Sequence, residues 1–443
     1  MPSPTYDFIL RGGTLVSSRG RQQADVGVRN GRITEIGDLS AHDAAEVFDA
    51  THLLVLPGVI DSQVHFREPG GEAKEDLETG TRAAVLGGVT AVCEMPNTNP
   101  PTTNQAALED KFRRAKGRAH CDVGFFAGAS PDNVDDLAGL EAYPGVPGVK
   151  IFMGSSTGTL LVSRDDDLRR VLRATKKRVA VHCEDEDRLN ERRALLNDDS
   201  PPSMHPVWRD AECAFRATRR LVGLLQETDR KAHILHCTTA EEMAFLADHK
   251  DRVTVETTPQ HLTLTSPECY ERLGTYAQMN PPIRGAAHQE ALWKALHAGT
   301  VDVLGSDHAP HTREEKDRGY PNTPSGMPGV QTILPVMLEH VHQGRLSLEK
   351  LVELLCEGPA RVWDIQGKGH TAPGYDADFT LVNPDHTWTI ENDWIATRAG
   401  WTPFDGLQIH GEPVATIIHG QVVMRDAEVL VEGSGQPLRF ATR

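Results

Sequence analysis

The sequence lacks the features of a membrane protein or of a disulfide-stabilised one. It has no apolar run of the roughly 18 residues that a transmembrane helix needs, and its start, MPSPTYDFILRGG, has no charged segment followed by an apolar core. We therefore expect neither a transmembrane helix nor a signal peptide. Its seven cysteines are odd in number and form no Cys-x-x-Cys pair, which is typical of reduced thiols in a cytoplasmic protein.

The chain also has fewer positively charged residues than negatively charged ones. The chain has 46 lysines and arginines against 63 aspartates and glutamates, a formal net charge of −17. Because binding to phosphates needs a basic face, we expect no nucleic-acid partner. Charged residues make up 25% of the chain and hydrophobic residues 39%, which excludes disorder as the main state. The length of 443 residues suits two or three domains.

Both ends of the chain read as short strands. The segments YDFILRGGTLV, ADVGVRNGRITEIG and AEVFDA near the start alternate apolar and polar residues between Gly and Asn turns. DADFTLVNPDHTWTI and PVATIIHGQVVMRDAEVLVEG near the end have the same character. This pattern is typical of antiparallel strands. We expect one small β-sandwich domain built from residues 1–54 and 371–443.

The middle of the chain alternates strand-like and helical segments. Eight apolar runs are candidate strands: 53–61, 89–97, 121–129, 148–154, 178–185, 232–239, 253–259 and 301–308. Amphipathic helical patterns follow or separate them, at 104–117, 165–177, 209–227, 240–250, 288–299, 329–344 and 347–363. Repeated βα units with nearly continuous apolar strands predict an α/β fold, a (β/α)8 TIM-type barrel over residues 55–370.

Polar residues gather where these predicted strands end. His65 follows the first strand, and Lys150 opens KIFMG in the fourth. The other three residues end short apolar runs: His182 ends VAVH, His236 ends ILH and Asp307 ends VLGSD. The C-terminal strand ends of such a barrel face one pocket. Imidazoles and a carboxylate converging on a pocket suit a divalent metal such as zinc. A single histidine of this kind is more often a core or surface residue. A lysine there is more often ion-paired, and its ammonium would repel a metal unless it is neutralised or chemically altered.

Further residues suit substrate binding and proton transfer. Asp307, in SDHAPHT, is either a helix-capping residue or a metal ligand that also serves as general base. Arg67, Asn97 and His311 follow predicted strands and are either loop anchors or a receptor for a substrate carboxylate. We favour the functional interpretation because these residues occur together.

The motifs as a set resemble those of dihydroorotases in the amidohydrolase superfamily. They are DSQVHFREPG, KEDLETGTRAAVLGGVTAVCEMPNTNP, GVKIFMGSS, VHCED, ILHCTT, ETTPQHL, MNPPIR and GSDHAPHT. The resemblance covers nearly the whole chain, including the split β domain. It implies the reversible, metal-dependent cyclisation of N-carbamoyl-L-aspartate to L-dihydroorotate in pyrimidine synthesis.

The resemblance also implies roles for individual residues. His65, Lys150, His182, His236 and Asp307 would ligate one or two zinc ions, with Lys150 carboxylated to an anionic carbamate that removes the electrostatic objection. Asp307 would accept a proton and pass it to the leaving nitrogen. Arg67, Asn97 and His311 would hold the substrate carboxylate, and Asn280 would contact the pyrimidine ring. Cobalt and manganese can use the same ligands as zinc.

One position departs from the family pattern. The first strand of the family carries His-x-His, whereas this chain has Gln63-Val64-His65. An amide oxygen is a weaker zinc ligand than an imidazole nitrogen. The second metal position is therefore weakened, ligated poorly by Gln63, or empty. A smaller departure is Gln260, where many relatives have histidine.

Three functions remain open on the sequence. The first is an active dihydroorotase acting on a small-molecule substrate, as a homodimer or homotetramer of the kind common in this superfamily. The second is a non-catalytic dihydroorotase-like subunit associated with aspartate transcarbamoylase, which Gln63 could mark. The third is another cyclic amidohydrolase, of hydantoinase or allantoinase type. Arg67 favours the first, because a substrate with a free carboxylate explains an arginine. The loop 155–167, rich in Ser, Thr and Gly, is a candidate lid.

Overall fold

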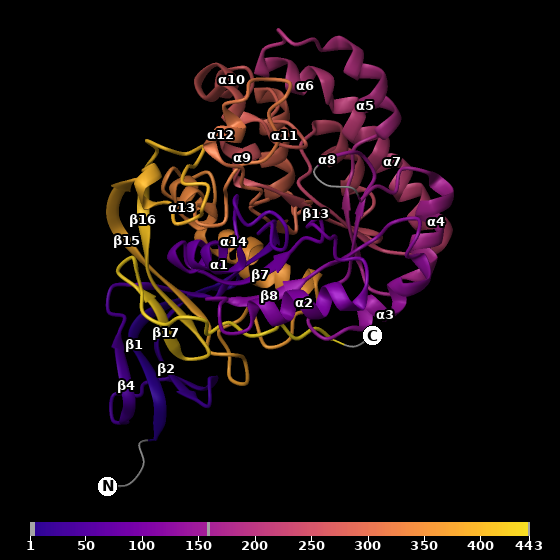
Figure 1. The fold of residues 1–443 in the computed structure, drawn as a ribbon. Coiled ribbons are helices and arrows are strands. Elements are labelled where there is room, and N and C mark those ends of the chain that lie inside the picture. The colour runs from indigo at the N-terminus through magenta and orange to yellow at the C-terminus, as the bar shows by residue number, and fades with distance from the viewer. Residues whose placement is uncertain (1–4, 157–159, 442–443) are drawn as a thin grey trace.

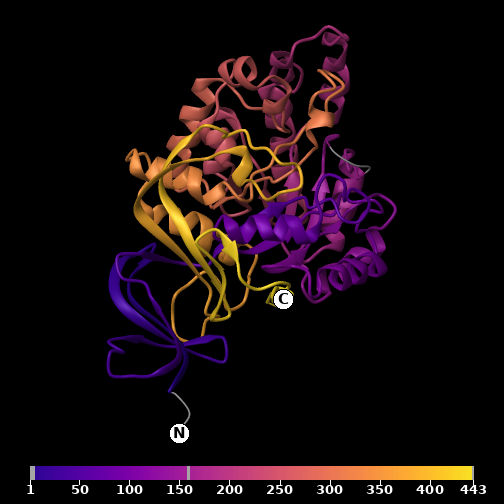
Figure 2. The ribbon, with the colours of Figure 1, turned by 60° about the vertical axis from the view of Figure 1, so that its left-hand side comes forward.

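The computed structural model describes residues 5–156 and 160–441. It has a barrel with helices around it and, beside the barrel, a large sheet to which both ends of the chain contribute (Figures 1 and 2). Part of the candidate lid, residues 157–159, is outside the described residues. No helix in the described ranges has the length and apolar character needed to cross a bilayer.

Eight parallel strands form the barrel in the described chain, with β8 and β9 counted as one, which confirms the predicted (β/α)8 architecture. They are β6 (Val59–Val64), β7 (Val89–Glu94), β8 (Asp122–Phe125) continued by β9 (Ala127–Gly128), β10 (Val149–Phe152), β11 (Val179–His182), β12 (Ala232–Ile234), β13 (Val253–Thr257) and β14 (Val303–Leu304). All neighbouring pairs are parallel. A parallel bridge between Val64 and His308 joins β6, the first barrel strand, to the segment that follows β14, the last one. The polar residues at the strand ends therefore lie around one rim.

Helices cover the outside of the barrel and the loops above it (Figure 1). Those described are α1 (Leu77–Leu86), α2 (Gln105–Ala115), α3 (Leu137–Ala142), α4 (Asp165–Ala174), α5 (Glu186–Arg192), α6 (His205–Trp208), α7 (Ala211–Thr228), α8 (Ala240–Ala247), α9 (Pro259–Thr263), α10 (Glu268–Leu273), α11 (Ala286–His297), α12 (Arg313–Lys316), α13 (Ile333–His342), α14 (Leu348–Val352) and α15 (Gly358–Val362). In α4 the buried residues Leu168, Val171 and Leu172 have the spacing of one helix face. The apolar stripe seen in the sequence is thus the stripe that packs on the barrel.

The predicted helix over 347–363 is divided in the structure. A wide π turn over Glu353–Glu357 separates α14 from α15, and Pro359 occupies the first turn of α15. Proline has no backbone N–H to donate, so it fits best at the start of a helix. The single amphipathic pattern therefore continues through a local change of winding.

The large sheet joins strands from both termini. It contains β1 (Tyr6–Ser17), β2 (Gly20–Arg29), β3 (Arg32–Gly37), β4 (Ala44–Asp49), β5 (Leu54–Pro57), β15 (Phe379–Thr389), β16 (Gln408–Ile418), β17 (Gln421–Arg425) and β18 (Glu428–Val429). The first half of β1 pairs with β4 and its second half with β5. Side chains such as Phe8, Val26, Phe379 and Ile417 share one buried cluster. In Figures 1 and 2 the indigo and yellow strands accordingly lie side by side.

The segment predicted as the first barrel strand is two strands. β5 pairs with β1 and β15 in the large sheet, whereas β6 begins after Gly58 and enters the barrel. A side chain at Gly58 would come within 2.3 Å of the Thr90 hydroxyl oxygen, so only glycine allows this close passage. The expected domain boundary at 54/55 therefore falls inside β5.

A buried ion network joins the barrel to the large sheet at the opposite end from the polar rim. The Lys368 ammonium contacts Asp122, at the start of β8, at 2.7 Å and also pairs with Asp378, next to β15. The C-terminal segment passes the same end, where Pro437 bridges to Val123. Buried charges are tolerated only when paired in this way. The network leaves the other end of the barrel free for the polar cavity.

Candidate functional site

A cavity at the carboxyl ends of the barrel strands brings together nearly all the residues expected from the sequence. The lining includes Gln63, His65, Arg67, Asn97, Lys150, His182, His236, Asn280 and Asp307. Lys150 is the second residue of β10. The others come from the ends of β6, β7, β11, β12 and β14, or from the segments that follow them, and Asn280 comes from the loop after α10. Since this rim is where barrel enzymes place their active sites, the arrangement supports the functional interpretation over the structural one.

Two histidines of the cavity face each other through one ring nitrogen each, and one hydrogen lies between them. His182 Nδ1 and His236 Nε2 are 3.1 Å apart. The other ring nitrogen of His182, Nε2, is 2.8 Å from the Glu184 carboxylate and donates to it. Arg209 in turn forms an ion pair with that carboxylate. Glu184 thus fixes the tautomer in which His182 Nδ1 carries a lone pair, as the partners behind metal-bound histidines do.

The spacing of these two nitrogens fits one metal ion. Two imidazoles on a tetrahedral zinc, each bound at about 2.0–2.1 Å, hold their nitrogens about 3.3 Å apart. His236 Nδ1 is buried without a hydrogen-bond partner in the described chain. The Nε2 proton of His236 can therefore move to Nδ1 when a cation replaces it between the rings.

Lys150 is suited to becoming a third ligand. It is almost completely buried, and its ammonium nitrogen lies 4.4 Å from the centre of the Phe152 ring. No described carboxylate is within ion-pair distance of it. Burial lowers the pKa of Lys150 to about 7, so much of the amine is neutral near neutral pH. Only a neutral amine can react with carbon dioxide to form a carbamate, because the reaction needs its lone pair.

The other half of the cavity fits a metal less well. The Gln63 amide nitrogen donates to Asp307 Oδ1 at 3.0 Å, and His65 Nε2 is 3.3 Å from the same oxygen. At the first position of the His-x-His pattern, this chain therefore presents the N–H group of Gln63 to Asp307 in place of an imidazole. In the described residues, no three His, Cys, Asp or Glu side chains form a metal-binding group. The donor set suits one ion near His182 and His236 and disfavours a second near Gln63.

Arg67 and His311 occupy different layers of the site. Arg67 lines the cavity, while its Nε donates to Pro310 O and its Nη2 lies 3.3 Å from His311 Nε2. His311 has no exposed surface. Its Nδ1 is 3.2 Å from Glu315 Oε2 and donates to that carboxylate, which leaves Nε2 as the acceptor for Arg67. The structure thus places His311 behind Arg67, as a support for the guanidinium, and not in the cavity wall.

Asn97 and Asn280 both reach the cavity. Asn97 Oδ1 is 2.7 Å from His65 Nδ1, so it accepts the proton of that nitrogen and leaves His65 Nε2 as the lone-pair nitrogen. Asn280 Nδ2 donates to Ser156 Oγ at 3.2 Å. The predicted carboxylate receptor is therefore split: Arg67 faces the cavity, Asn97 orients a histidine, and His311 lies beneath.

Several residues of the cavity were not expected from the sequence. Phe152, Ser156, Ala309, Ser325 and Gly326 complete the lining. Phe152 and Ser156 belong to the quoted motif GVKIFMGSS, so their position after a strand could have indicated them. Ser325 and Gly326 come from a loop without such a signal. The Gly326 N–H donates to Gln278 O at 2.9 Å and holds this loop at the cavity wall. A contact between such distant segments cannot be read from the sequence.

Three site residues have a left-handed backbone. Arg67, His236 and Asp307 have φ angles of 63°, 37° and 44°. Such angles are uncommon for residues other than glycine and cost of order 1–3 kcal/mol each. They occur where the chain leaves a barrel strand and turns toward the cavity. The fold therefore bears local strain at the positions that aim these side chains.

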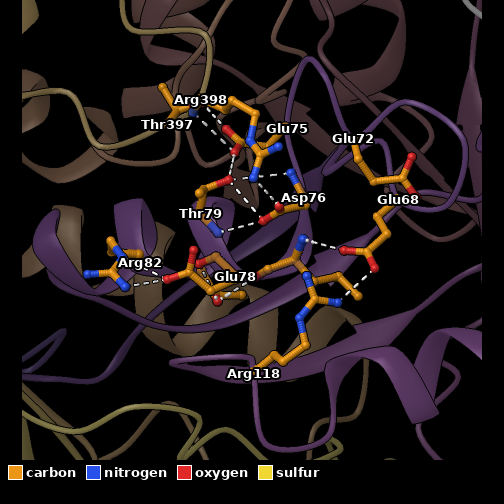
Figure 3. A network of polar contacts seen from close by, with 12 residues as sticks. Glu68, Glu72, Glu75, Asp76, Glu78, Thr79, Arg82, Arg118, Thr397 and Arg398 are labelled. Carbon is orange, nitrogen blue, oxygen red and sulfur yellow. Dashed lines mark hydrogen bonds and ion pairs between the residues drawn. The ribbon is translucent and has the colours of Figure 1, made fainter.

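A polar network fixes the loop that carries His65 and Arg67. Figure 3 shows this network, in which Glu75 and Asp76 hold Thr397 and Arg398 from a distant part of the chain. Glu68 accepts from Leu77 N at 2.9 Å and from Arg118 at 2.8 Å. The loop between β6 and α1 is thereby tied at both ends, which limits movement of Arg67.

Comparisons with known proteins identify relatives of this chain. The sequence pattern described as the Amidohydrolase family matches residues 54–423. A dihydroorotase of Methanothermobacter thermautotrophicus is 37% identical over 93% of each chain. An allantoinase of Deinococcus radiodurans is 35% identical over 98% of this chain and 99% of its own. The solved structure of an L-hydantoinase (dihydropyrimidinase) from Arthrobacter aurescens superposes with a TM-score of 0.93 at 31% identity, covering 98% and 100% of the two chains.

Proposed function

From the premise that the chain belongs to the amidohydrolase family, we propose that it is a dihydroorotase. It would interconvert N-carbamoyl-L-aspartate and L-dihydroorotate, closing or hydrolysing a cyclic amide bond in pyrimidine biosynthesis. The observation that carries this proposal is Arg67 at the wall of the cavity. A buried guanidinium there is explained by a substrate with a free carboxylate, and hydantoin and allantoin have none.

The contacts of Arg67 support this role. Its Nε and Nη2 are engaged by Pro310 O and His311, while Nη1 has no hydrogen bond to any described residue. Burial lowers the pKa of Arg67 to about 10, so the group stays charged at neutral pH. The supports fix the guanidinium plane and leave one terminal nitrogen for the ligand, which would form a charge-assisted hydrogen bond.

A divalent ion, most simply zinc, completes the proposed site. Its ligands would be His182, His236 and a carboxylated Lys150, with one ion per chain. When bound, such an ion supplies Lewis acidity, which polarises the ring carbonyl and lowers the pKa of a water molecule. His65 and Gln63 both contact Asp307. The Gln63 N–H donates to the carboxylate and holds it at the wall, where it accepts a proton and returns it to the ring nitrogen.

The test of function compares substrates with and without a carboxylate. Arg67→Ala should lower kcat/KM for dihydroorotate by about 10- to 100-fold, the range for a lost hydrogen bond to a charged group. Activity on dihydrouracil, which lacks the carboxylate, should change little. Arg216→Ala is the matched control, because Arg216 is half exposed and pairs with Glu212 on α7.

Three results would count against the proposal. Dihydroorotate turnover that survives Arg67→Ala would remove the carboxylate argument. A wild-type preference for dihydrouracil or allantoin would indicate another cyclic amidohydrolase. No turnover of any of these by zinc-loaded protein would favour the non-catalytic subunit.

Metal content tests the proposed single ion. Gln63→His replaces the amide that donates to Asp307 with an imidazole, and should raise bound zinc from about one toward two per chain. Elemental analysis after dialysis measures the ratio. Gln260→His is the control, since Gln260 is buried outside the cavity and donates to Ser306 O. An unchanged ratio in Gln63→His would mean that something other than the missing imidazole limits the second position.

A further inference from the structure

A buried histidine outside the cavity contacts the cavity residue Asn280. His205 begins α6, in the segment that follows α5, and has no exposed surface. Its Nε2 is 3.0 Å from Met279 O and also 3.0 Å from Asn280 Oδ1. The ring packs edge-on against Trp208 and Tyr320. His205 is therefore held by its own packing, and among the described residues its hydrogen bonds lead to Asn280 and the neighbouring Met279.

The hydrogen on the His205 ring can be assigned from these contacts. Met279 O is a carbonyl and can only accept, so Nε2 must carry the hydrogen that lies between them. Nδ1 is buried and has no hydrogen-bond partner in the described chain. Burial, with the Arg209 charge as the second cause, lowers the pKa of His205 to about 3. The ring is thus neutral at physiological pH and has a single preferred tautomer.

This tautomer decides which end of the Asn280 amide faces the cavity. An N–H donor at His205 Nε2 requires an acceptor opposite it, so Asn280 places its oxygen there. Its Nδ2 then points the other way and donates to Ser156 Oγ at the cavity wall. If the Asn280 amide were rotated by 180°, its N–H group would face the N–H of His205, and its oxygen would face Ser156 Oγ.

We propose that His205 is a positioning residue that makes Asn280 a hydrogen-bond donor to the substrate ring, and so selects rings that present a carbonyl oxygen at that point. The choice of dihydroorotate as ligand rests on the function proposed above. The orientation of Asn280 does not, because it follows from contacts within the chain. A ring that presents an N–H at this point would meet a second donor and bind poorly.

The experiment uses two amides of different reach. In His205→Gln, the side-chain nitrogen can occupy the place of Nε2, whereas in His205→Asn the shorter side chain ends near the place of Nδ1. We expect KM for dihydroorotate to rise roughly 3- to 10-fold in His205→Asn, the effect of one lost buried hydrogen bond. It should stay within about threefold of wild type in His205→Gln, and kcat should change less than KM in both.

A double variant isolates the route of the effect. Asn280→Ala removes the group that His205 orients, so adding His205→Asn to it should raise KM no further. Equal KM values for wild type, His205→Gln and His205→Asn would overturn the proposal. So would additive effects with Asn280→Ala, because His205 would then act by another path.

A spectroscopic readout is independent of substrate and of variant folding. Nitrogen-15 NMR of wild-type histidines should show His205 as the Nε2–H tautomer, unchanged between about pH 5 and 8. The Nδ1–H tautomer, or a titration in this range, would refute the assignment. Failure of wild type to turn over dihydroorotate would instead refute the proposed function, and the NMR test of the His205 tautomer would still apply.

Discussion

Alanine in place of Lys150 is expected to remove the bound metal and the turnover of dihydroorotate together. In the proposed site, His182 and His236 supply two nitrogens, and the carbamate on Lys150 supplies the third protein ligand. Loss of a partner behind a ligand costs about 10–100-fold in metal affinity, and loss of a ligand should cost more. Elemental analysis after dialysis and an assay of ring opening measure the two effects on the same sample.

Two controls make this result specific to the carbamate. Lys116→Ala removes an exposed lysine at the end of α2 and should leave metal content unchanged. A short carboxylic acid such as acetate or propionate, added to Lys150→Ala, should restore part of the metal binding, because it can fill the space of the carbamate. Full metal retention by Lys150→Ala would exclude Lys150 as a ligand.

The second large effect is expected at Asp307. Asp307→Asn keeps the size of the side chain but removes the group that takes up a proton, so kcat should fall by about 10²- to 10⁴-fold. The backbone should tolerate the change, because Asp307 has a φ of 44° and asparagine is one of the residues enriched in the left-handed region. Thermal unfolding and circular dichroism should match wild type.

Metal content separates this variant from Lys150→Ala. With one ion near His182 and His236, Asp307→Asn should lose turnover while retaining the ion. The exposed Asp385 provides the matched control as Asp385→Asn. Substantial residual activity of Asp307→Asn would refute the proton-transfer role. Loss of the ion along with activity would identify Asp307 as a ligand and would contradict the single position proposed here.

The barrel could be predicted because its strands are buried on both faces. Segments such as 121–129 and 148–154 are mostly apolar, and amphipathic helices separate many of these segments. Two local features could not be predicted from such patterns. The apolar run 53–61 contains strands of two different sheets, and the periodicity of 347–363 continues through a π turn. An apolar pattern reports burial but not which neighbour buries it.

The polar residues of the site could also be predicted as a group. The residues His65, Lys150, His182, His236 and Asp307 lie in or just after strands that end at the same rim. The topology therefore brings them near one another. The placement of His311 behind Arg67 could not be predicted, because a position just after a strand does not tell whether a side chain faces the cavity or lies beneath it.

The sequence by itself determined the eight-stranded barrel, the set of chemical groups at its rim and the substitution of Gln63 for histidine. These follow from apolar periodicity and from residue identity, which are local properties of the chain. Only the tertiary structure decided which ring nitrogen carries the hydrogen in His182, His65 and His205, because Glu184, Asn97 and Met279 accept those hydrogens. A hydrogen bond depends on distance and direction between groups, and these exist only once the chain has folded.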